Sequence, residues 1–293
     1  MSPSARVVGF LCALAAPLCW SIGGTVFRAV EAGPWEAIFW RSLGHVLVFP
    51  AVLCWRFGAA GFSDLHRAPI MVLIVVSCIA GTFVFHVQAM MSTTVANVLV
   101  MQSTSPLLVA ILGWIVLGER VERRGWATIA IAFAGLVPVI GTSLGGGKFG
   151  GDLLALGVAL CSACMVILIR RARALNLQAV SWFGAVLAVL IAFPLATPLA
   201  LAGGDIVLLL GLGIVQMTLG LSFFLYALRL LPAAQVTLIA LLEPVLGPLW
   251  VWLFAGEEPP TLTLVGGAVV LSALAVNTTL ALRSVAKPAV QPA

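Results

Sequence analysis

Residues 239–258 decide the fold: IALLEPVLGPLWVWLFAGEE is long and apolar enough to cross a lipid bilayer, yet it carries Glu243 inside the apolar run. A second stretch, residues 101–120, reads MQSTSPLLVAILGWIVLGER and lies 138 residues earlier. The same Pro, Trp, Gly and Glu recur in register, while Ser105 stands where Glu243 would be. The two stretches together indicate a membrane protein built from a duplicated unit.

The composition places most of the chain in lipid. Hydrophobic residues make up 62% of the 293 residues and charged residues 9%, with a mean hydropathy of +1.18, whereas soluble domains have roughly 45–50% apolar and about 25% charged residues. The alternating ten-residue strands of an outer-membrane barrel do not occur. The sequence therefore predicts an all-α integral membrane protein with ten transmembrane helices. They are expected at residues 7–30, 34–55, 68–91, 94–117, 125–142, 152–169, 177–201, 206–230, 234–255 and 261–282.

Lys and Arg are distributed unequally over the loops between these spans. Twelve fall on one side, two on the other, and Arg41 lies within a span. The larger set is Arg6, Arg56, Arg67, Arg120, Arg123, Arg124, Arg170, Arg171, Arg173, Arg229, Arg283 and Lys287, and the smaller is Arg28 and Lys148. This positive-inside pattern predicts a bacterial inner (plasma) membrane protein with both termini in the cytoplasm. The net charge of +5 then needs no nucleic-acid partner.

The duplication extends over the whole chain. An offset of 138 pairs Ala89 with Ala227, Ala96 with Ala234, Pro106 with Pro244, Trp114 with Trp252 and Gly118-Glu119 with Gly256-Glu257, and an offset of 142 pairs Cys19 with Cys161, Arg28 with Arg170 and Trp40 with Trp182. We predict a first five-helix repeat at 1–143, a glycine-rich connector at 144–150, a second repeat at 151–283 and a cytoplasmic tail at 284–293. Because five is odd, the second repeat starts on the opposite side of the membrane and is inverted, as in many secondary transporters.

Motifs for catalysis, metals or cofactors are not evident. No HExxH or GxSxG occurs, and the glycine-rich connector lacks the P-loop pattern. Cys161 and Cys164 have the spacing of a redox pair but lie in an apolar span, where Cys behaves as a small hydrophobe. We expect no catalytic residues, no metal and no cofactor. An integral-membrane enzyme and a channel remain the alternatives of other classes.

Three stretches resemble a known family: YALRLLPAAQVTLIALLEPVLGPLWVWLFAGE at 226–257, CWSIGGTVFR at 19–28 and FWRSL at 39–43. They are similar to the EamA-type branch of the drug/metabolite transporter superfamily. The resemblance implies a secondary transporter in the lipid bilayer, acting as a monomer or weak homodimer on a small-molecule substrate. Its nearest functional type exports amino acids, including aromatic ones, by alternating access, and export of drugs or cationic compounds is the alternative.

Polar and aromatic side chains at membrane depth are the candidates for a substrate pathway, because polar groups there usually face the bundle interior. They are Trp20, Phe83, His86, Gln102, Gln216, Phe223, Tyr226 and Glu243, with Phe85 and Phe224 beside the aromatic ones. For each a simpler explanation exists. The glutamines can join neighbouring helices, the tryptophan can be packing, and the aromatic rings can face lipid.

Glu243 and the two repeated prolines have specific expected roles. Glu243 lies near the membrane midplane, where it could exchange a proton as coupling ion, bind a substrate amine, or hydrogen-bond a carbonyl beside Pro244. Pro106 and Pro244 each remove a helical N–H, so symmetric bends that help gating are expected. Arg41 lies roughly 10 Å into its helix, and we predict that it extends outward or meets Glu36 as an anchoring charge.

Overall fold

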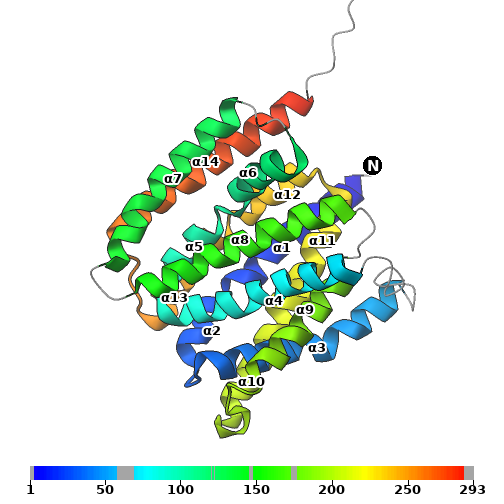
Figure 1. Ribbon diagram of the computed structural model, residues 1–293, viewed down its shortest axis with the longest axis vertical. Helices are drawn as coiled ribbons and strands as arrows, with labels where there is room; N and C mark the ends of the chain where they lie inside the picture. The colour runs from blue at the N-terminus through cyan, green and yellow to red at the C-terminus, as the bar shows by residue number, and fades with distance from the viewer. Residues whose placement is uncertain are drawn as a thin grey trace, which may run out of the picture.

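The computed structural model describes residues 3–57, 69–119, 121, 123–144, 148–172 and 177–286, and all regular structure within these residues is helical (Figure 1). The first half contains α1 (Pro3–Ser21), α2 (Gly23–Ala29), α3 (Pro34–Phe57), α4 (Pro69–Ser92), α5 (Val95–Gln102), α6 (Ser105–Leu117) and α7 (Arg123–Leu144). The second half contains α8 (Phe149–Ala172), α9 (Leu177–Ala192), the 3₁₀ helix η3 (Pro198–Ala200), α10 (Gly203–Leu212), the π-helix η4 (Gly213–Gly220), α11 (Leu221–Leu230), α12 (Ala233–Ala240), α13 (Glu243–Ala255) and α14 (Thr261–Ala286). The predicted all-α class is confirmed.

Nine helical stretches among the described residues are long and apolar enough to cross a membrane, and the tenth pass is the shorter α9. We predicted that this seventh span would run to residue 201, which is wrong, because α9 ends at Ala192. Pro194 explains the end, since proline has no N–H to donate and disfavours helical geometry in the residue before it. The chain returns through η3 to α10.

The two halves have matching helix boundaries. α5 and α12, like α6 and α13, begin and end at residues that are 138 apart. Gly118 and Gly256, which follow α6 and α13, both have φ of 68°, a left-handed conformation that glycine adopts at little cost. The repeat seen in the sequence is therefore also a repeat of backbone geometry. Residues 145–147 of the predicted connector and 287–293 of the predicted tail lie outside the described residues.

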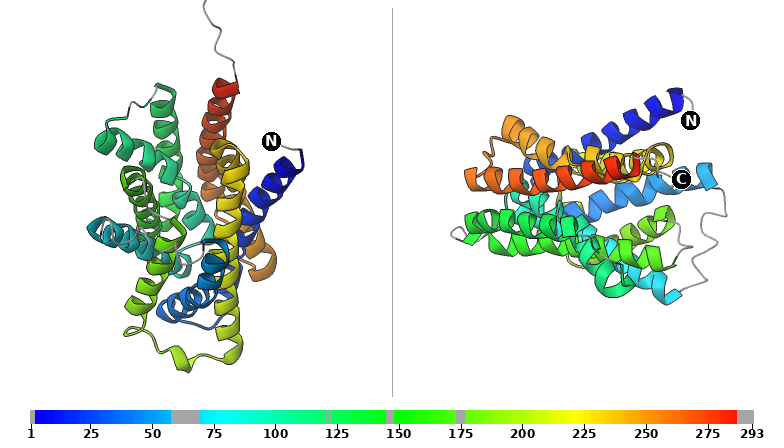
Figure 2. Two further views of the ribbon diagram at one scale, coloured as in Figure 1. Left: turned by 90° about the vertical axis from the view of Figure 1, so that its right-hand side faces the viewer. Right: turned by 90° about the horizontal axis from the view of Figure 1, so that it is seen from above.

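Helices of the first half pack directly against helices of the second half. α4 packs on α8, α1 on α11, α3 on α9 and α7 on α14, and each pair takes one helix from each half. Both termini lie at the same end of the bundle (Figure 2), which we call the N-terminal face, and the other end we call the far face. α1 begins at the N-terminal face and its counterpart α8 begins at the far face (Figure 1). This arrangement is the predicted inverted repeat.

Three of the predicted spans are interrupted near their middle. α1 and α2 are separated at Ile22, α5 and α6 at residues 103–104, and α12 and α13 at residues 241–242. We expected bends at the repeated prolines, and the structure places Pro106 and Pro244 in the first turn after two of these breaks. Proline alone is not the cause, because Pro17 and Pro50 lie inside unbroken helices. Broken helices at this depth are tolerated where they border a cavity.

Candidate functional site

A cavity of about 650 Å³ lies between the two halves, and side chains from both halves line it. Its lining contains seven pairs of residues that the repeat relates to each other. They are Trp20 and Ser162, His86 and Phe224, Leu99 and Thr237, Gln102 and Ala240, Ser103 and Leu241, Ser105 and Glu243, and Pro106 and Pro244. The cavity therefore lies where an axis relating the two halves would pass.

Most of the predicted pathway residues face this cavity. Those on its lining are Trp20, Phe83, His86, Gln102, Pro106, Gln216, Glu243 and Pro244. Their roles in transport stay predictions, but they come together from α1, α4, α5, α6, η4 and α13. Residues distant in the sequence thus line one cavity.

Phe223 and Tyr226 are not on the lining, and Phe224 takes their place. A Cβ on Gly220 would touch the indole of Trp20, so this face of the helix points at Trp20. Phe224 follows four residues later on the same face, and its ring centroid is 5.3 Å from that of Trp20. Around the helix axis, the side chain of Phe223 leaves α11 about 100° away from that of Phe224, and the side chain of Tyr226 about 200° away. Tyr226 is accordingly 41% exposed on the outside.

Arg41 is the main correction to the sequence-based prediction. It does not extend outward or meet Glu36, but lines the cavity and is only 5% exposed. Glu36 instead accepts hydrogen bonds from the backbone N and Oγ1 of Thr197, at 2.8 and 2.9 Å. Glu36 and Arg41 are five positions apart, which turns them by roughly 140° around the helix. The two side chains therefore leave different faces of α3.

Arg41 is held by a bridge through Gln216. Arg41 Nε donates to Gln216 Oε1 at 2.8 Å, and Gln216 Nε2 donates to the carbonyl of Trp20 at 2.7 Å. Gln216 lies in the π-helix η4, a geometry found often at functional sites. Gly23 and Gly213 permit the close approach, because a Cβ on them would meet Gln216 and the carbonyl of Arg41. The bridge joins α3, η4 and the break after α1.

Several polar groups on the lining, among them two that are buried, have no hydrogen-bond partner among the described residues. Arg41 Nη1 and His86 Nε2 make no hydrogen bond, although His86 Nδ1 lies 2.9 Å from Gln102 Nε2. No hydrogen bond or ion pair joins the Glu243 carboxyl group to any residue that the structure describes. A buried donor or acceptor that lacks a hydrogen bond costs roughly 1–3 kcal/mol. Such groups are suited to a polar ligand that supplies the missing contacts.

The backbone adds acceptors at the helix breaks. Pro106 and Pro244 have no N–H, so neither can donate to the carbonyl four residues earlier, at Gln102 and Ala240. Both of these residues line the cavity. In the first half the break also uses hydroxyl groups, since Ser103 Oγ and Thr104 Oγ1 each donate to a carbonyl at 2.6 Å.

Comparison with known proteins assigns the family. The model of the EamA-like transporter family matches residues 7–141 and again residues 149–279. The chain belongs to the EamA-like transporter family. No curated protein sequence matches it. Among solved structures, a crystal structure of a protein is similar at a TM-score of 0.63 and 20% identity, over 97% of this chain and 99% of that one. At this identity, the similarity shows the fold alone.

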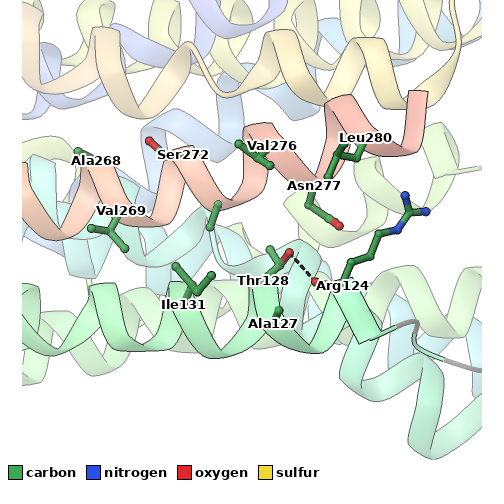
Figure 3. Close-up of a pocket in the computed structure, with 11 residues that line it drawn as sticks. Arg124, Ala127, Thr128, Ile131, Ala268, Val269, Ser272, Val276, Asn277 and Leu280 are labelled. Atoms are coloured by element: carbon green, nitrogen blue, oxygen red, sulfur yellow. Dashed lines mark hydrogen bonds between the residues drawn. The ribbon is translucent and has the colours of Figure 1, made fainter. Parts of the chain in front are cut away.

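The EamA-like transporter has a second hollow, between α7 and α14, of about 610 Å³ (Figure 3). Apolar side chains such as Ile131, Val269 and Val276 line it, and all three are at least 38% exposed. Gly135 and Gly266 allow α7 and α14 to approach closely, because a Cβ on either glycine would meet the backbone of the other. Side chains this exposed on a membrane-spanning helix face lipid. The cavity lined by Trp20, Arg41 and Glu243 is therefore the candidate substrate site.

Sequence reasoning missed several lining residues of the transporter. They are Arg41, Thr82, Leu99, Ser103, Ser105, Val109, Val158, Ser162, Met165, Val166, Thr237, Ala240 and Leu241. A signal for some of them was present, because the offsets of 138 and 142 carry Glu243 onto Ser105 and Trp20 onto Ser162. Arg41 has no such signal, since its counterpart is Phe183.

Proposed function

We propose that this transporter exports amino acids, or closely related small zwitterions, across the bacterial inner membrane by alternating access. One observation carries the proposal: a basic group and an acidic group, Arg41 and Glu243, line the same cavity without pairing with each other. An amino acid carries both complementary charges on one carbon. Its carboxylate would bind the open side of the Arg41 guanidinium, and its ammonium group would bind Glu243.

The rest of the lining suits an apolar or aromatic side chain. Trp20, Phe83 and Phe224 supply ring surfaces, and Trp20 and Phe224 contact each other. Small-molecule sites generally span about 300–1,000 Å³ and combine apolar walls with few polar groups. The cavity of about 650 Å³ falls in this range. It is roomy enough for an aromatic amino acid.

Proton coupling through Glu243 forms part of the proposal. Protonation would neutralise the carboxyl group in one conformation and deprotonation would restore it in the other, so that proton binding and substrate binding exclude each other. Its counterpart Ser105 cannot take up a proton in this way. An asymmetric pair on a symmetric scaffold gives one coupling site per transporter.

The direction of export rests on the predicted topology. The excess of Lys and Arg at the N-terminal face favours a cytoplasmic location for that face. A cysteine placed at Gly203, at the start of α10, should react with an impermeant thiol reagent from the periplasm, whereas one placed at Arg123, at the start of α7, should be protected. The reverse pattern would invert the direction proposed.

Competition among truncated analogues tests the substrate class. Purified transporter is reconstituted in liposomes, and exchange of labelled phenylalanine is measured against unlabelled phenylalanine, phenethylamine and 3-phenylpropionate. The zwitterion should compete at least roughly tenfold better than either analogue, because each analogue leaves one buried charge unpaired. A panel of organic cations is run in parallel. Preference for phenethylamine and cations over the zwitterion would replace the proposal with drug export.

Arg41→Gln tests, in the same assay, whether Arg41 binds the carboxylate of the substrate. The variant should bind phenylalanine and phenethylamine almost equally, because the discriminating guanidinium is gone. Arg171→Gln is the matched control, since Arg171 is exposed at the end of α8 and away from the lining. Unchanged discrimination in Arg41→Gln would remove Arg41 from the site.

A further inference from the structure

Two ion pairs occupy repeat-related positions at opposite faces of the bundle. Arg28 Nε contacts Glu257 Oε2 at 2.6 Å at the far face, and Arg170 Nη1 contacts Glu119 Oε2 at 3.0 Å at the N-terminal face. Arg170 is the counterpart of Arg28 at the offset of 142, and Glu119 is the counterpart of Glu257 at the offset of 138. Each pair joins one half of the chain to the other. The same pair of charges is thus present twice, once on each side of the cavity.

The pair at the far face is embedded in helix ends. Arg28 also donates to the carbonyls of Met90 and Thr93, at 2.6 and 2.9 Å, around the C-terminus of α4. Glu257 Oε1 accepts from the backbone N–H of Val95 at 2.9 Å, at the N-terminus of α5. A cation at a helix C-terminus and an anion at a helix N-terminus both match the helix dipoles. The Arg28–Glu257 pair therefore closes the connection between α4 and α5.

The pair at the N-terminal face lacks these additional bonds. Among the described residues, Arg170 bonds only to Glu119, and the two side chains are 51% and 52% exposed, against 24% and 22% for Arg28 and Glu257. The equivalent helix ends are nonetheless present. The offset of 138 carries Met90, Thr93 and Val95 onto Leu228, Leu231 and Ala233, at the C-terminus of α11 and the N-terminus of α12.

Burial follows the same asymmetry. Every residue of α5 from Val95 to Met101 is buried. In the equivalent α12, Ala233, Gln235 and Thr237 are exposed. The cavity is therefore covered on the side of the Arg28–Glu257 pair, and the side of the Arg170–Glu119 pair is the more open one.

We propose that the two ion pairs are the two gates of the transport cycle and that this structure has the far gate closed and the N-terminal gate open. The inference rests on alternating access, as proposed above. In the opposite state, Arg170 would donate to the carbonyls of Leu228 and Leu231, and Glu119 would accept from the N–H of Ala233. Arg28 and Glu257 would then give up their bonds to the ends of α4 and α5. The inverted repeat lets one set of contacts form at one face as the equivalent set is lost at the other.

Cysteine labelling from each side tests the gates without needing a substrate. The six native cysteines are replaced, and Val95→Cys and Ala233→Cys, a repeat-related pair, serve separately as reporters. Neither side chain is a gate contact, because both residues contribute through backbone N–H groups. With intact gates, an impermeant maleimide should label the Ala233 reporter rapidly from the N-terminal face and the Val95 reporter slowly from the far face.

Glu257→Gln should shift the labelling of both reporters, whereas Glu119→Gln should shift neither. Glu257→Gln removes a charge-assisted bond of the closed gate, so far-face labelling of the Val95 reporter should rise roughly tenfold and labelling of the Ala233 reporter should fall. Glu119→Gln should leave the Val95 reporter slow and keep the Ala233 reporter fast, because it weakens only the opposite closed state. The same shift in both variants, or no shift in Glu257→Gln, would overturn the proposal.

A second readout covers the case in which Glu257→Gln fails to fold. The exposed Arg170–Glu119 pair contributes little to the stability of the state seen here. Glu119→Gln should therefore retain the melting temperature but lose several-fold in exchange turnover, whereas Glu258→Gln, an exposed acid next to the far gate, should retain both. Unchanged turnover in Glu119→Gln would contradict a gate. Absence of exchange in the protein with native gates would instead remove alternating access itself, so the two failures are distinguishable.

Discussion

α5 and α12 are the same element of the repeat in two different environments. α5 is buried against α8 and α13, and its N-terminus is held by Glu257. Among the residues of α12 whose burial the structure describes, three are exposed, and no described bond joins Glu119 to this helix. Both helices have eight residues and begin 138 positions apart. The difference is therefore not in the backbone of the element but in what covers it. A symmetric chain that adopts an asymmetric state has an equivalent state available with the roles exchanged.

The largest effect is expected at Arg41, where the halves differ most. Its counterpart is Phe183, so the basic group enters the cavity from one half alone. Arg41→Gln should lower zwitterion exchange at least roughly 30-fold, which corresponds to about 2 kcal/mol, because a buried charge contact is lost. Counterflow at several substrate concentrations measures it. Exchange within twofold of the native protein would show that this asymmetry does not determine binding.

Glu243 and Ser105 provide the next comparison, since they occupy one position in the two halves. Glu243→Gln should reduce net flux driven by a pH gradient and should also lower zwitterion exchange, each about tenfold, because the carboxylate both exchanges the proton and binds the substrate ammonium group. Ser105→Ala should affect neither.

Glu258→Gln is the control for the charge change, being exposed and outside the cavity. Loss of the pH-driven flux with exchange retained would limit Glu243 to proton coupling and remove it from the ammonium site. Native behaviour in both assays would exclude a transport role for its charge.

Pro106 and Pro244 are equivalent positions at which the two halves carry the same residue. Alanine at both sites restores an N–H that can reach the carbonyls of Gln102 and Ala240, and should join the two short helices on each side into straighter ones. We expect turnover to fall several-fold with substrate affinity nearly unchanged, measured by counterflow and by ligand-induced thermal shift. A single substitution should have roughly half the effect on the activation free energy. Unchanged turnover in the double variant would make the prolines incidental.

The smallest expected effect is on the KM of variants at two aromatic residues that lie on different faces of α11. Phe224→Ala should raise the KM for an aromatic substrate by roughly 2–10-fold, the range expected for one aromatic contact. Tyr226→Ala should leave KM unchanged, because Tyr226 points outward. An equal effect of both substitutions would contradict the orientation of α11.

The fold was largely predictable from the sequence because its two signals are long-range and redundant. Span length and hydropathy gave ten passes, and the recurrence of Pro, Trp and Gly-Glu gave the inverted repeat. The end of α9 was missed because residues 193–201 are as apolar as a helix, and only Pro194 shows where it stops. The break at Ile22 was missed for a similar reason, since Gly23-Gly24 is tolerated within helices as well as at their ends.

The cavity was only partly predictable, because hydropathy does not give helical phase when every face of a helix is apolar. Phe223, Phe224 and Tyr226 look alike in such a run, and packing of Gly220 against Trp20 decides among them. Arg41 was placed wrongly because a charge near a helix end usually extends to water. Its actual direction depends on Gln216, 175 residues away in the chain.

Trans-stimulated counterflow is the most direct test of the central claim, that one cavity between two equivalent halves is exposed alternately to the two sides. Proteoliposomes are loaded with a high concentration of unlabelled phenylalanine and diluted into a low concentration of labelled phenylalanine, and uptake of the label is followed. The account predicts transient accumulation of label above equilibrium, which disappears in empty liposomes and in Arg41→Gln. Flux that depends only on the gradient, with no stimulation from the opposite side, would contradict alternating access and indicate a channel.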